Sequence, residues 1–276
     1  MNTKIKTLLA SLLIVTTASF AGDGTVAATP DTAGNGVLYG GQSITHPESP
    51  HNLSLNTVSL AAADDNGEVC VYCHTPHAAN TAFAGAPIWN KKTLSTTFDM
   101  YGGGSAGAGT VAGTKTDATP NSPSLACLSC HDGVSGVDSI VNAPGSGSGL
   151  EANNGTNIVA IMGLNWKGGN IGGVPGTATT GNGDLSNDHP VSITYTPGTA
   201  SLRATTYPLP AGTDAAWVTP GGVGTIASLL RNGKVECSSC HDPHNATGVP
   251  QATSKQVNYL RHSNTNSELC FGCHNK

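Results

Sequence analysis

The chain has 276 residues, of which only 11% are charged and 5% aromatic, while glycine alone occupies 36 positions. A composition this poor in aromatic residues provides little side-chain material for an ordinary hydrophobic core. The formal net charge of −5 offers no basic stripe, so a nucleic acid is not an expected partner. We therefore expect bound groups other than side chains to supply part of the buried apolar surface.

The first 21 residues have the features of a secretory signal peptide. Lys4 and Lys6 give a short positive region, residues 8–15 form an apolar run, and small residues stand near Ala21. A membrane anchor is the alternative, but a spanning helix needs about 20 apolar residues and this run is far shorter. We expect cleavage after Ala21. The secreted chain would then work either in the periplasm or at the extracellular cell surface.

The remainder of the chain divides into four stretches by composition. Residues 22–48 are rich in glycine, threonine and alanine and predict an extended N-terminal arm. Residues 49–140 hold the first two cysteine pairs, and residues 186–276 hold the other two. Between them, residues 141–185 form an insert rich in glycine, asparagine and threonine. Each cysteine-bearing stretch is a candidate unit that binds two cofactors.

Local patterns predict only short regular elements. Residues 191–195 alternate in polarity as a short strand does, and residues 227–231 suit one or two helical turns. No long amphipathic helix and no regular strand repeat is evident in the sequence. The predicted fold is therefore mostly irregular and coil-rich, with few short helices and strands, and is organised around its cofactors.

All eight cysteines form C-x-x-C pairs, and a histidine directly follows each pair. C-x-x-C-H is the attachment signal of c-type haem, in which two thiols bind one porphyrin and the histidine is the proximal ligand of the iron. The predicted attachment residues are Cys70, Cys73, Cys127, Cys130, Cys237, Cys240, Cys270 and Cys273, and the predicted proximal ligands are His74, His131, His241 and His274.

Three other readings of the cysteines compete with haem attachment. They are zinc sites, a disulfide scaffold of a secreted chain and thioredoxin-like redox pairs. None requires histidine as the fifth residue of every motif, and with 10 histidines in the chain four chance occurrences are on the order of one in a million by composition. The sequence predicts four covalently attached haem c groups.

Six further histidines are available for the other side of the irons. A lone histidine is usually a surface or core residue, but four irons each offer a sixth coordination position. His77 and His244 end two copies of the pattern C-x-x-C-H-x-P-H. A residue three positions beyond the proximal histidine lies near the same helical face, so it cannot reach the opposite side of its own haem. We expect each of these two histidines to ligate a different haem and to draw two haems together.

His51 and His189 lie upstream of the paired motifs in polar segments next to proline. Together with His77 and His244 they are the four predicted distal ligands, two in each half of the chain. His46 is close enough to His51 to replace it, and we otherwise expect structural or exposed roles for His46 and His262. Met100 and Met162 are conceivable axial ligands, but the excess of histidine argues against them. Which distal histidine serves which haem stays open.

The motifs resemble those of the doubled C-x-x-C-H multihaem cytochromes of metal-reducing bacteria. Among them, the chain is most similar to the outer-surface tetrahaem cytochromes (OmcE-type) that polymerise into filaments, or nanowires. The likeness extends from about residue 42 to the end and is weak in the insert. It is carried by residues 50–54, 70–77, 86–90, 127–133, 188–192, 237–244 and 270–276.

The resemblance implies bis-histidine ligation, an extracellular destination and haems in one continuous stack through a polymer of identical subunits. It also suggests that one subunit donates an axial histidine to its neighbour, with an N-terminal histidine, His51 or His46, as the natural donor because the arm before it is free to reach across.

An iron with histidine on both sides has no open position for a substrate. We therefore expect an electron carrier and not an enzyme, with low potentials because no methionine ligand raises them. Its redox partners would be other cytochromes or extracellular acceptors. The alternatives are a monomeric periplasmic shuttle, a multihaem reductase with one open haem, and a filament in which haems have only a structural role.

Overall fold

The structure is a computed structural model. The described residues are 44, 51, 69–94, 96–101, 114–132, 135, 139–142, 183–186, 188–198, 201–209, 217–219, 224–244 and 259–275. The predicted signal peptide, almost all of the predicted arm, most of the predicted insert, His46 and Met162 lie outside these residues.

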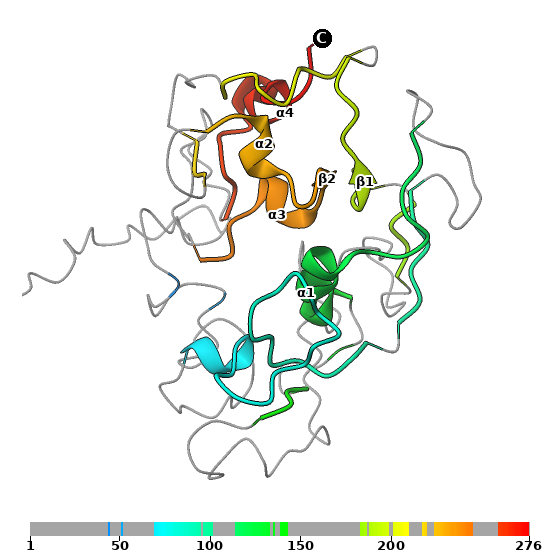
Figure 1. The fold of residues 1–276 in the computed structure, drawn as a ribbon, viewed down its shortest axis with the longest axis vertical. Helices are drawn as coiled ribbons and strands as arrows, with labels where there is room; N and C mark the ends of the chain where they lie inside the picture. Colours follow the sequence, from blue (N-terminus) through cyan, green and yellow to red (C-terminus); the bar gives the residue numbers. More distant parts are fainter. Residues whose placement is uncertain are drawn as a thin grey trace, which may run out of the picture.

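Regular structure within the described residues is sparse and short (Figure 1). Of the elements in this described part of the chain only α1 is longer than four residues, and the predicted coil-rich character is confirmed. The predicted short strand is present as β1, and the predicted helical turn near residue 227 is present as α2. The elements in chain order are η1 (Val69–Tyr72), α1 (Ser122–His131), β1 (Ile193–Thr194), α2 (Ile226–Leu229), β2 (Lys234–Val235), α3 (Cys237–Cys240), η5 (Thr265–Ser267) and α4 (Glu268–Phe271).

Local sequence explains where α1 and α3 begin. Pro123 lies in the first turn of α1, where its missing N–H group would have had no helical partner. Glu236 precedes α3 and forms a capping box with Ser239, in which each side chain bonds the other residue's backbone N–H. The start of α1 thus has one donor fewer to satisfy, and the start of α3, which is only one turn long, is capped by side chains.

The two strands bring a distant segment beside the third cysteine motif. β1 pairs with β2 in antiparallel register, with Ile193 opposite Val235 and Thr194 opposite Lys234. The backbone N–H of Ser192 also donates to the carbonyl of Val235 at 2.7 Å. Because β2 ends two residues before Cys237, this pairing fixes the stretch around residue 192 against the start of α3.

Among the described residues, the hydrophobic core is divided into three small clusters of buried residues, each next to a cysteine motif. The residues are Tyr72 and Ile140, then Met100, Leu128 and Leu185, then Tyr195, Leu209, Ile226 and Leu229. Cys73 packs on the first cluster and Cys273 on the third, while Leu128 of α1 belongs to the second. Met100 is fully buried among these apolar side chains, which suits a core residue and not an axial ligand.

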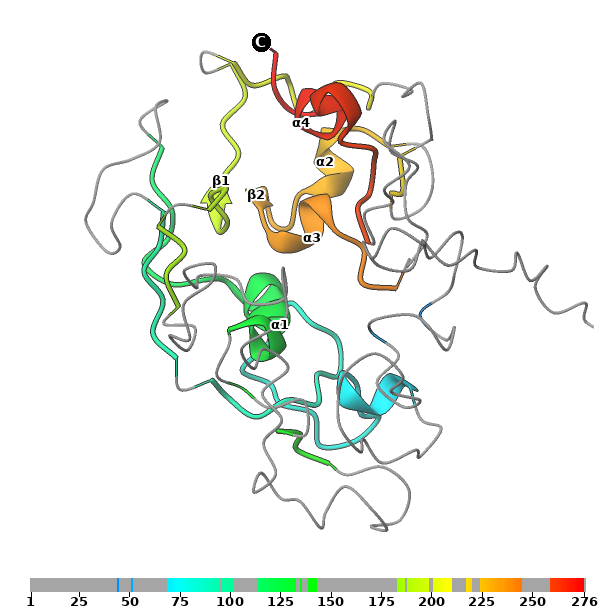
Figure 2. The same ribbon diagram turned by 180° about the vertical axis from the view of Figure 1, so that it is seen from behind.

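The helices that carry the second and third motifs meet in the middle of the molecule. α1 packs against α3, and α3 packs against α2. Views from the two sides agree that η1 lies beyond α1, whereas α2 and α4 lie beyond α3 (Figures 1 and 2). The four motifs are thus distributed along the long direction of the molecule.

Asn90 holds the segment around the first motif together. The side chain is fully buried, and its Nδ2 donates to the carbonyls of Val71 and Asn142 at 2.6 and 2.8 Å. Its Oδ1 accepts the N–H of Asn142 at 2.9 Å, and its own N–H donates to the carbonyl of Cys73 at 2.8 Å. One amide side chain therefore joins the first motif to residues 139–142.

Replacement of Asn90 by alanine should lower the free energy of unfolding by about 3 kcal/mol, because it leaves buried backbone groups without partners. Guanidinium unfolding followed by circular dichroism measures the change. The exposed Asn275 provides the matched control, since N275A should change stability by less than about 0.5 kcal/mol. Equal stabilities of N90A and N275A would contradict this role.

Gly272 lies within the fourth motif, where there is no room for a side chain. A Cβ at this position would lie 2.5 Å from two ring atoms of Trp217. We expect G272A to destabilise the protein by about 1–3 kcal/mol through overpacking. In a W217L background the same substitution should cost much less, and a double-mutant cycle measures the coupling. An equal cost in both backgrounds would show that the indole is not the obstacle.

Candidate haem-binding sites

Each C-x-x-C pair lies on a helical turn, as the spacing predicts. In the first motif the N–H groups of Cys73 and His74 donate to the carbonyl of Cys70 at 3.1 and 2.8 Å, and the fourth motif repeats both bonds at the same lengths. The third motif is α3 itself, and the second forms the last turn of α1. Side chains three apart on a helix share a face, so both thiols of a pair point to the same side.

The eight thiols are not joined in disulfides, and burial raises the pKa of several of them. All eight cysteines are described, and all are free thiols. Burial raises the pKa of Cys73 to about 12 and that of Cys240 to about 12. The pKa of Cys237 differs, because a hydrogen bond with Cys127 lowers it, as happens at one thiol of thioredoxin-type pairs. Among the described residues, no group of three or more histidine, cysteine or acidic side chains could hold a zinc ion.

Thiols of consecutive motifs lie close together. A hydrogen bond with Cys237 is the largest cause of the raised pKa of Cys127, and it lowers the pKa of Cys237 itself. Charge repulsion from Cys130 contributes, after burial, to the raised pKa of Cys73. Charge repulsion from Cys273 of the fourth motif likewise contributes, after burial, to the raised pKa of Cys240. The second motif therefore adjoins both the first and the third, and the third adjoins the fourth, so that spatial order follows chain order.

Three predicted proximal histidines each face a predicted distal histidine. The three pairs have ring centroids 6.1 to 6.4 Å apart, whereas His51 and Tyr259 stack directly at 4.2 Å. The pairs and their separations are His74 and His244 at 6.1 Å, His131 and His51 at 6.1 Å, and His274 and His189 at 6.4 Å.

This separation suits two imidazoles on opposite sides of one metal ion. A bond from a metal ion to an imidazole nitrogen is about 2.0 Å long, so the two nitrogens lie about 4 Å apart and the ring centres about 6 Å apart. The planes of His74 and His244 are inclined by 22°, and those of the other two pairs by 66° and 73°. The described histidines therefore fit axial ligation of haem iron at three of the four motifs.

Hydrogen bonds orient several of these rings for ligation through Nε2. Nδ1 of His74 lies 2.8 Å from the carbonyl oxygen of Pro87, and Nδ1 of His51 lies 3.2 Å from that of Pro243. A carbonyl oxygen can only accept, so Nδ1 carries the proton and Nε2 keeps its lone pair for a metal. His189 bonds its neighbour's carbonyl in the same way, at 3.1 Å.

The electrostatics of the second pair favour a neutral ligand. Burial, followed by the charge of His131, lowers the pKa of His51 to about 4. Burial and His131 also lower the pKa of His241. Metal ions bind the neutral imidazole, so these rings need not lose a proton before they ligate at neutral pH.

Two predicted ligands are not brought to a facing ring. His77 is exposed, and its carbonyl accepts bonds from Thr75 Oγ1 at 3.1 Å and from Asn142 Nδ2 at 3.0 Å. Among the described residues, no histidine ring faces His77. Likewise, no described distal histidine faces His241 across the position that a metal ion would occupy. The third motif therefore has its proximal histidine in place without a described distal one.

The spare histidine His262 is buried and packs flat on Trp217, with ring centroids 4.5 Å apart. This placement suits a structural role, one of the two that the sequence suggested for it.

Several supporting residues were not identified as such from the sequence. Tyr259 stacks on His51, and its hydroxyl accepts the N–H of His51 at 3.0 Å. The edge of Trp89 meets the ring of His74 at 5.3 Å. The Pro-His dipeptide at residues 243–244 indicated His244 as a ligand, but it did not indicate that the carbonyl of Pro243 bonds His51.

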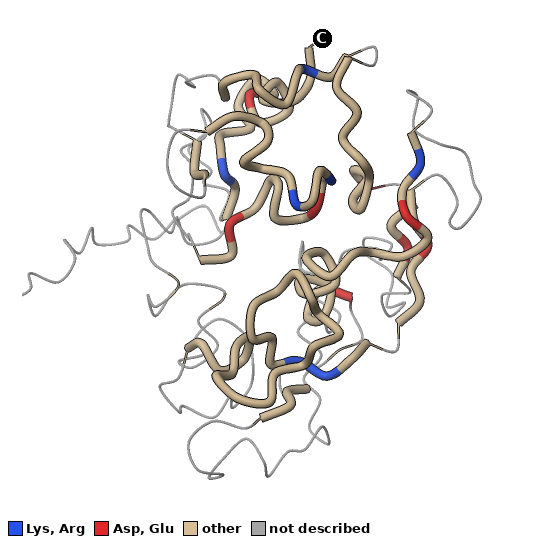
Figure 3. Tube along the Cα trace, viewed as in Figure 1, with Lys and Arg blue, Asp and Glu red and all other residues tan. Residues whose placement is uncertain are grey.

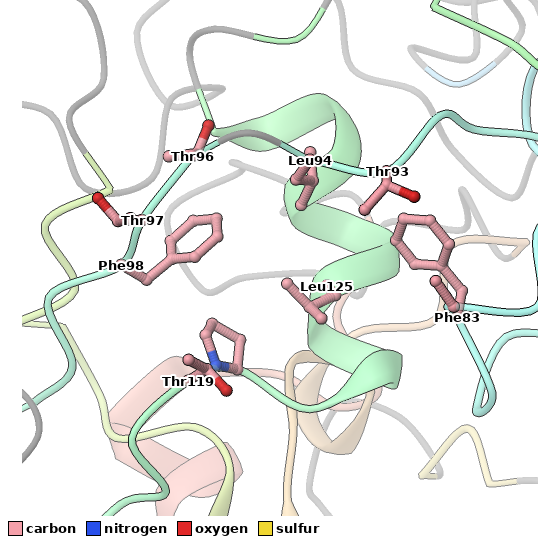
Figure 4. Close-up of a pocket in the computed structure, with 10 residues that line it drawn as sticks. Phe83, Thr93, Leu94, Thr96, Thr97, Phe98, Thr119 and Leu125 are labelled. Atoms are coloured by element: carbon pink, nitrogen blue, oxygen red, sulfur yellow. The ribbon is translucent and has the colours of Figure 1, made fainter.

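A cavity of about 340 Å³ lies beside α1, near Leu125 (Figure 4). Phe83, Leu94, Phe98 and Leu125 contribute apolar walls, and threonines line the remainder together with Ala82 and Pro120. None of the predicted attachment cysteines or histidines lines it, so it is distinct from the sites described above.

Within the described part of the chain, no helix has both the length and the apolar character needed to cross a membrane.

Comparison with known families agrees with this geometry. The family described by the doubled CXXCH motif matches residues 230–276, which contain the third and fourth motifs. A search of curated proteins found no match to the chain. The matched family and the motifs indicate covalently bound c-type haem and support a multihaem c-type cytochrome.

Proposed function

We propose that the protein is an exported tetrahaem electron carrier in which each C-x-x-C-H motif binds one haem c through bis-histidine ligation. The observation that carries the proposal is the set of three facing histidine pairs, each 6.1 to 6.4 Å between ring centres. Haem supplies one-electron redox chemistry when bound. Export agrees with the signal peptide predicted from the sequence, and c-type cytochromes typically work in the periplasm or outside the cell.

The pairs support a distal ligand for each of three motifs. His244 would ligate the iron of the first motif, His51 that of the second and His189 that of the fourth. The first assignment joins the two halves of the chain, because His74 and His244 come from different predicted units. This haem would therefore act as a link between the units as well as a redox centre.

The protein's own residues would make the sites suited to electron transfer and not to catalysis. At the first, second and fourth motifs a histidine on each side would leave no position for a substrate, so electron transfer would take place without bond formation to the metal. The hydrogen bonds at Nδ1 keep the rings oriented through the redox change. Two imidazole ligands without methionine favour low potentials.

The contacts between thiols of consecutive motifs support a path that runs from the first haem to the fourth in chain order. Cys70 and Cys270 are the two exposed cysteines, and they belong to the first and last motifs. We infer that electrons enter and leave at these two ends.

Exposed apolar residues at both ends support assembly with other copies. Ile88 and Val141 are 51% and 42% exposed. The carbonyl of Ile88 accepts the N–H of Thr75, and the N–H of Val141 donates to the carbonyl of Asn90. Phe271, which is 39% exposed, lies within the fourth motif. Because the two ends present different surfaces, contact between them would be head to tail and would propagate as a filament.

In such a filament, His77 is the candidate to complete the third haem of a neighbouring copy. His51, which the resemblance suggested as a donor, faces His131 of its own chain. His77 is exposed beside the first motif, on a loop fixed by Thr75 and Asn142. The proposed donor is therefore His77, the x-Pro-His histidine of the first motif, in place of His51.

A multihaem reductase is the second candidate, because His241 faces no distal histidine among the described residues. An iron that stays five-coordinate in the assembled protein would bind cyanide, whereas an electron carrier with four closed irons would not.

The pair formed by His74 and His244 predicts the effect of removing one distal ligand. H244A should convert one haem in four to a high-spin ferric form, because its iron loses its sixth ligand while the others keep theirs. Electron paramagnetic resonance of the oxidised protein, with haem quantified as pyridine haemochrome, measures the fraction. H262F keeps a ring on Trp217 and is the control, with no added high-spin signal. A fully low-spin H244A would refute the assignment.

The role of His77 predicts a link between spin state and assembly. H77A should form no filaments in electron micrographs and should show a high-spin haem at all protein concentrations. Added imidazole should restore the low-spin state without restoring filaments, since it replaces the ligand and not the neighbour. Filaments of H77A with four low-spin haems would contradict the proposal, and a wild-type monomer with four low-spin haems would favour the shuttle.

A further inference from the structure

A buried carboxylate lies where the second and third motifs meet. Glu236 is 2% exposed and directly precedes Cys237. It caps the start of α3, while its side chain reaches toward the start of α1. These are the two helices whose cysteines adjoin through Cys127 and Cys237. The function proposed above assigns this residue no part.

Four donors surround the Glu236 carboxylate. Oε2 accepts the hydroxyls of Ser124 and Ser192 at 2.5 and 3.0 Å, and Oε1 accepts Asn121 Nδ2 at 3.1 Å. The backbone N–H of Ser239 supplies the fourth bond through the capping box. Hydrogen bonds of this kind stabilise the charged form of a carboxyl group.

The direction of these bonds follows from what else the serines bind. Ser124 Oγ accepts the N–H of Cys237 at 3.1 Å, and Ser192 Oγ accepts the N–H of Asn121 at 2.8 Å. Each hydroxyl is thus already an acceptor and turns its own proton toward Glu236. The amide nitrogen of Asn121 and the N–H of Ser239 can only donate. The site is therefore built for a negative charge.

No cation is paired with this charge among the described residues. Lys234 bonds Asp117, whose side chain is 41% exposed, and Asn121 Nδ2 also bonds Asp117 at 2.9 Å. Charged side chains are few along the whole described chain (Figure 3). A buried charge without a counter-charge is costly even when it is hydrogen-bonded. A positive group bound next to Glu236 would offset that cost.

We propose that Glu236 is a positioning residue that sets the potentials of the haems on the second and third motifs by stabilising their ferric states. This inference rests on the proposed electron-transfer function. A ferric haem carries one more positive charge than a ferrous haem, so a nearby buried anion favours oxidation and lowers the potential. Glu236 is the residue before Cys237, and Ser124 bonds both the Glu236 carboxylate and the N–H of Cys237. Ser124 also lies one helical turn before Cys127.

Burial makes this interaction stronger than a surface charge would be. Water and salt screen exposed charges effectively and buried charges much less. Asp117 provides the comparison, since it contacts the same amide of Asn121 but is exposed and bonded to Lys234. Glu236 should therefore control the potentials in a way that Asp117 does not.

The test is E236Q in the haem-loaded protein, with potentials measured by spectroelectrochemical titration and haem counted as pyridine haemochrome. Glutamine keeps the shape and one acceptor oxygen but removes the charge. We expect the reduction equilibrium of one or two haems to shift at least tenfold toward the ferrous form. This corresponds to a rise of about 59 mV or more in the reduction potential of those haems. The other haems should shift less than twofold, and D117N should shift every haem less than twofold.

Retention of four low-spin haems with unchanged potentials in E236Q would overturn the inference and leave the proposed function intact. A wild-type protein without four reducible haems would instead overturn the proposed function.

If E236Q fails to retain its haems, N121K provides the second test, because it places an ammonium group between the carboxylates of Asp117 and Glu236. An upward shift confined to one or two haems in N121K supports the inference. Unchanged potentials in N121K refute it, since a purely structural Glu236 would not respond to a neutralising charge.

Discussion

The separation between paired imidazole rings is the constraint on which the remaining structure depends, because it matches the space that one metal ion would occupy. A gap of 6.1 to 6.4 Å between ring centres is too wide for direct contact, so the protein must fix each ring independently. Backbone carbonyls do this at Nδ1 of His74, His51 and His189. The irregular segments that supply these carbonyls would be poor structural choices in an ordinary domain, but here they position the histidines that we propose as ligands.

The same constraint accounts for the divided core. Each small cluster of buried side chains lies beside a cysteine motif, and together they include few aromatic residues. Bound porphyrins would supply the apolar surface that the side chains do not, and polar anchors such as Asn90 hold the segments between clusters. Folding and cofactor attachment are then closely coupled, since each haem would be covalently joined to one segment and ligated by another.

The sequence was sufficient to predict what depends on local spacing. The helical turns of the motifs, the strand near residue 193 and the coil-rich character are present in the structure. The histidines predicted as distal ligands are described, and three of them face a proximal ring. The pairings were not predictable, because His74 and His244 are distant in the chain and no periodic pattern links them. The same is true of Tyr259 on His51 and of the serines around Glu236, whose contacts arise only from tertiary packing.

The positions of the irons test the account most directly. Crystals of the haem-loaded protein, measured at the iron absorption edge, would locate each metal by anomalous scattering without assumptions about the ligands. The account predicts an iron midway between the rings of His74 and His244, another between His131 and His51, and a third between His274 and His189. An iron bound to His74 with His244 remote from it would contradict the pairing, and with it the proposed link between the two halves of the chain.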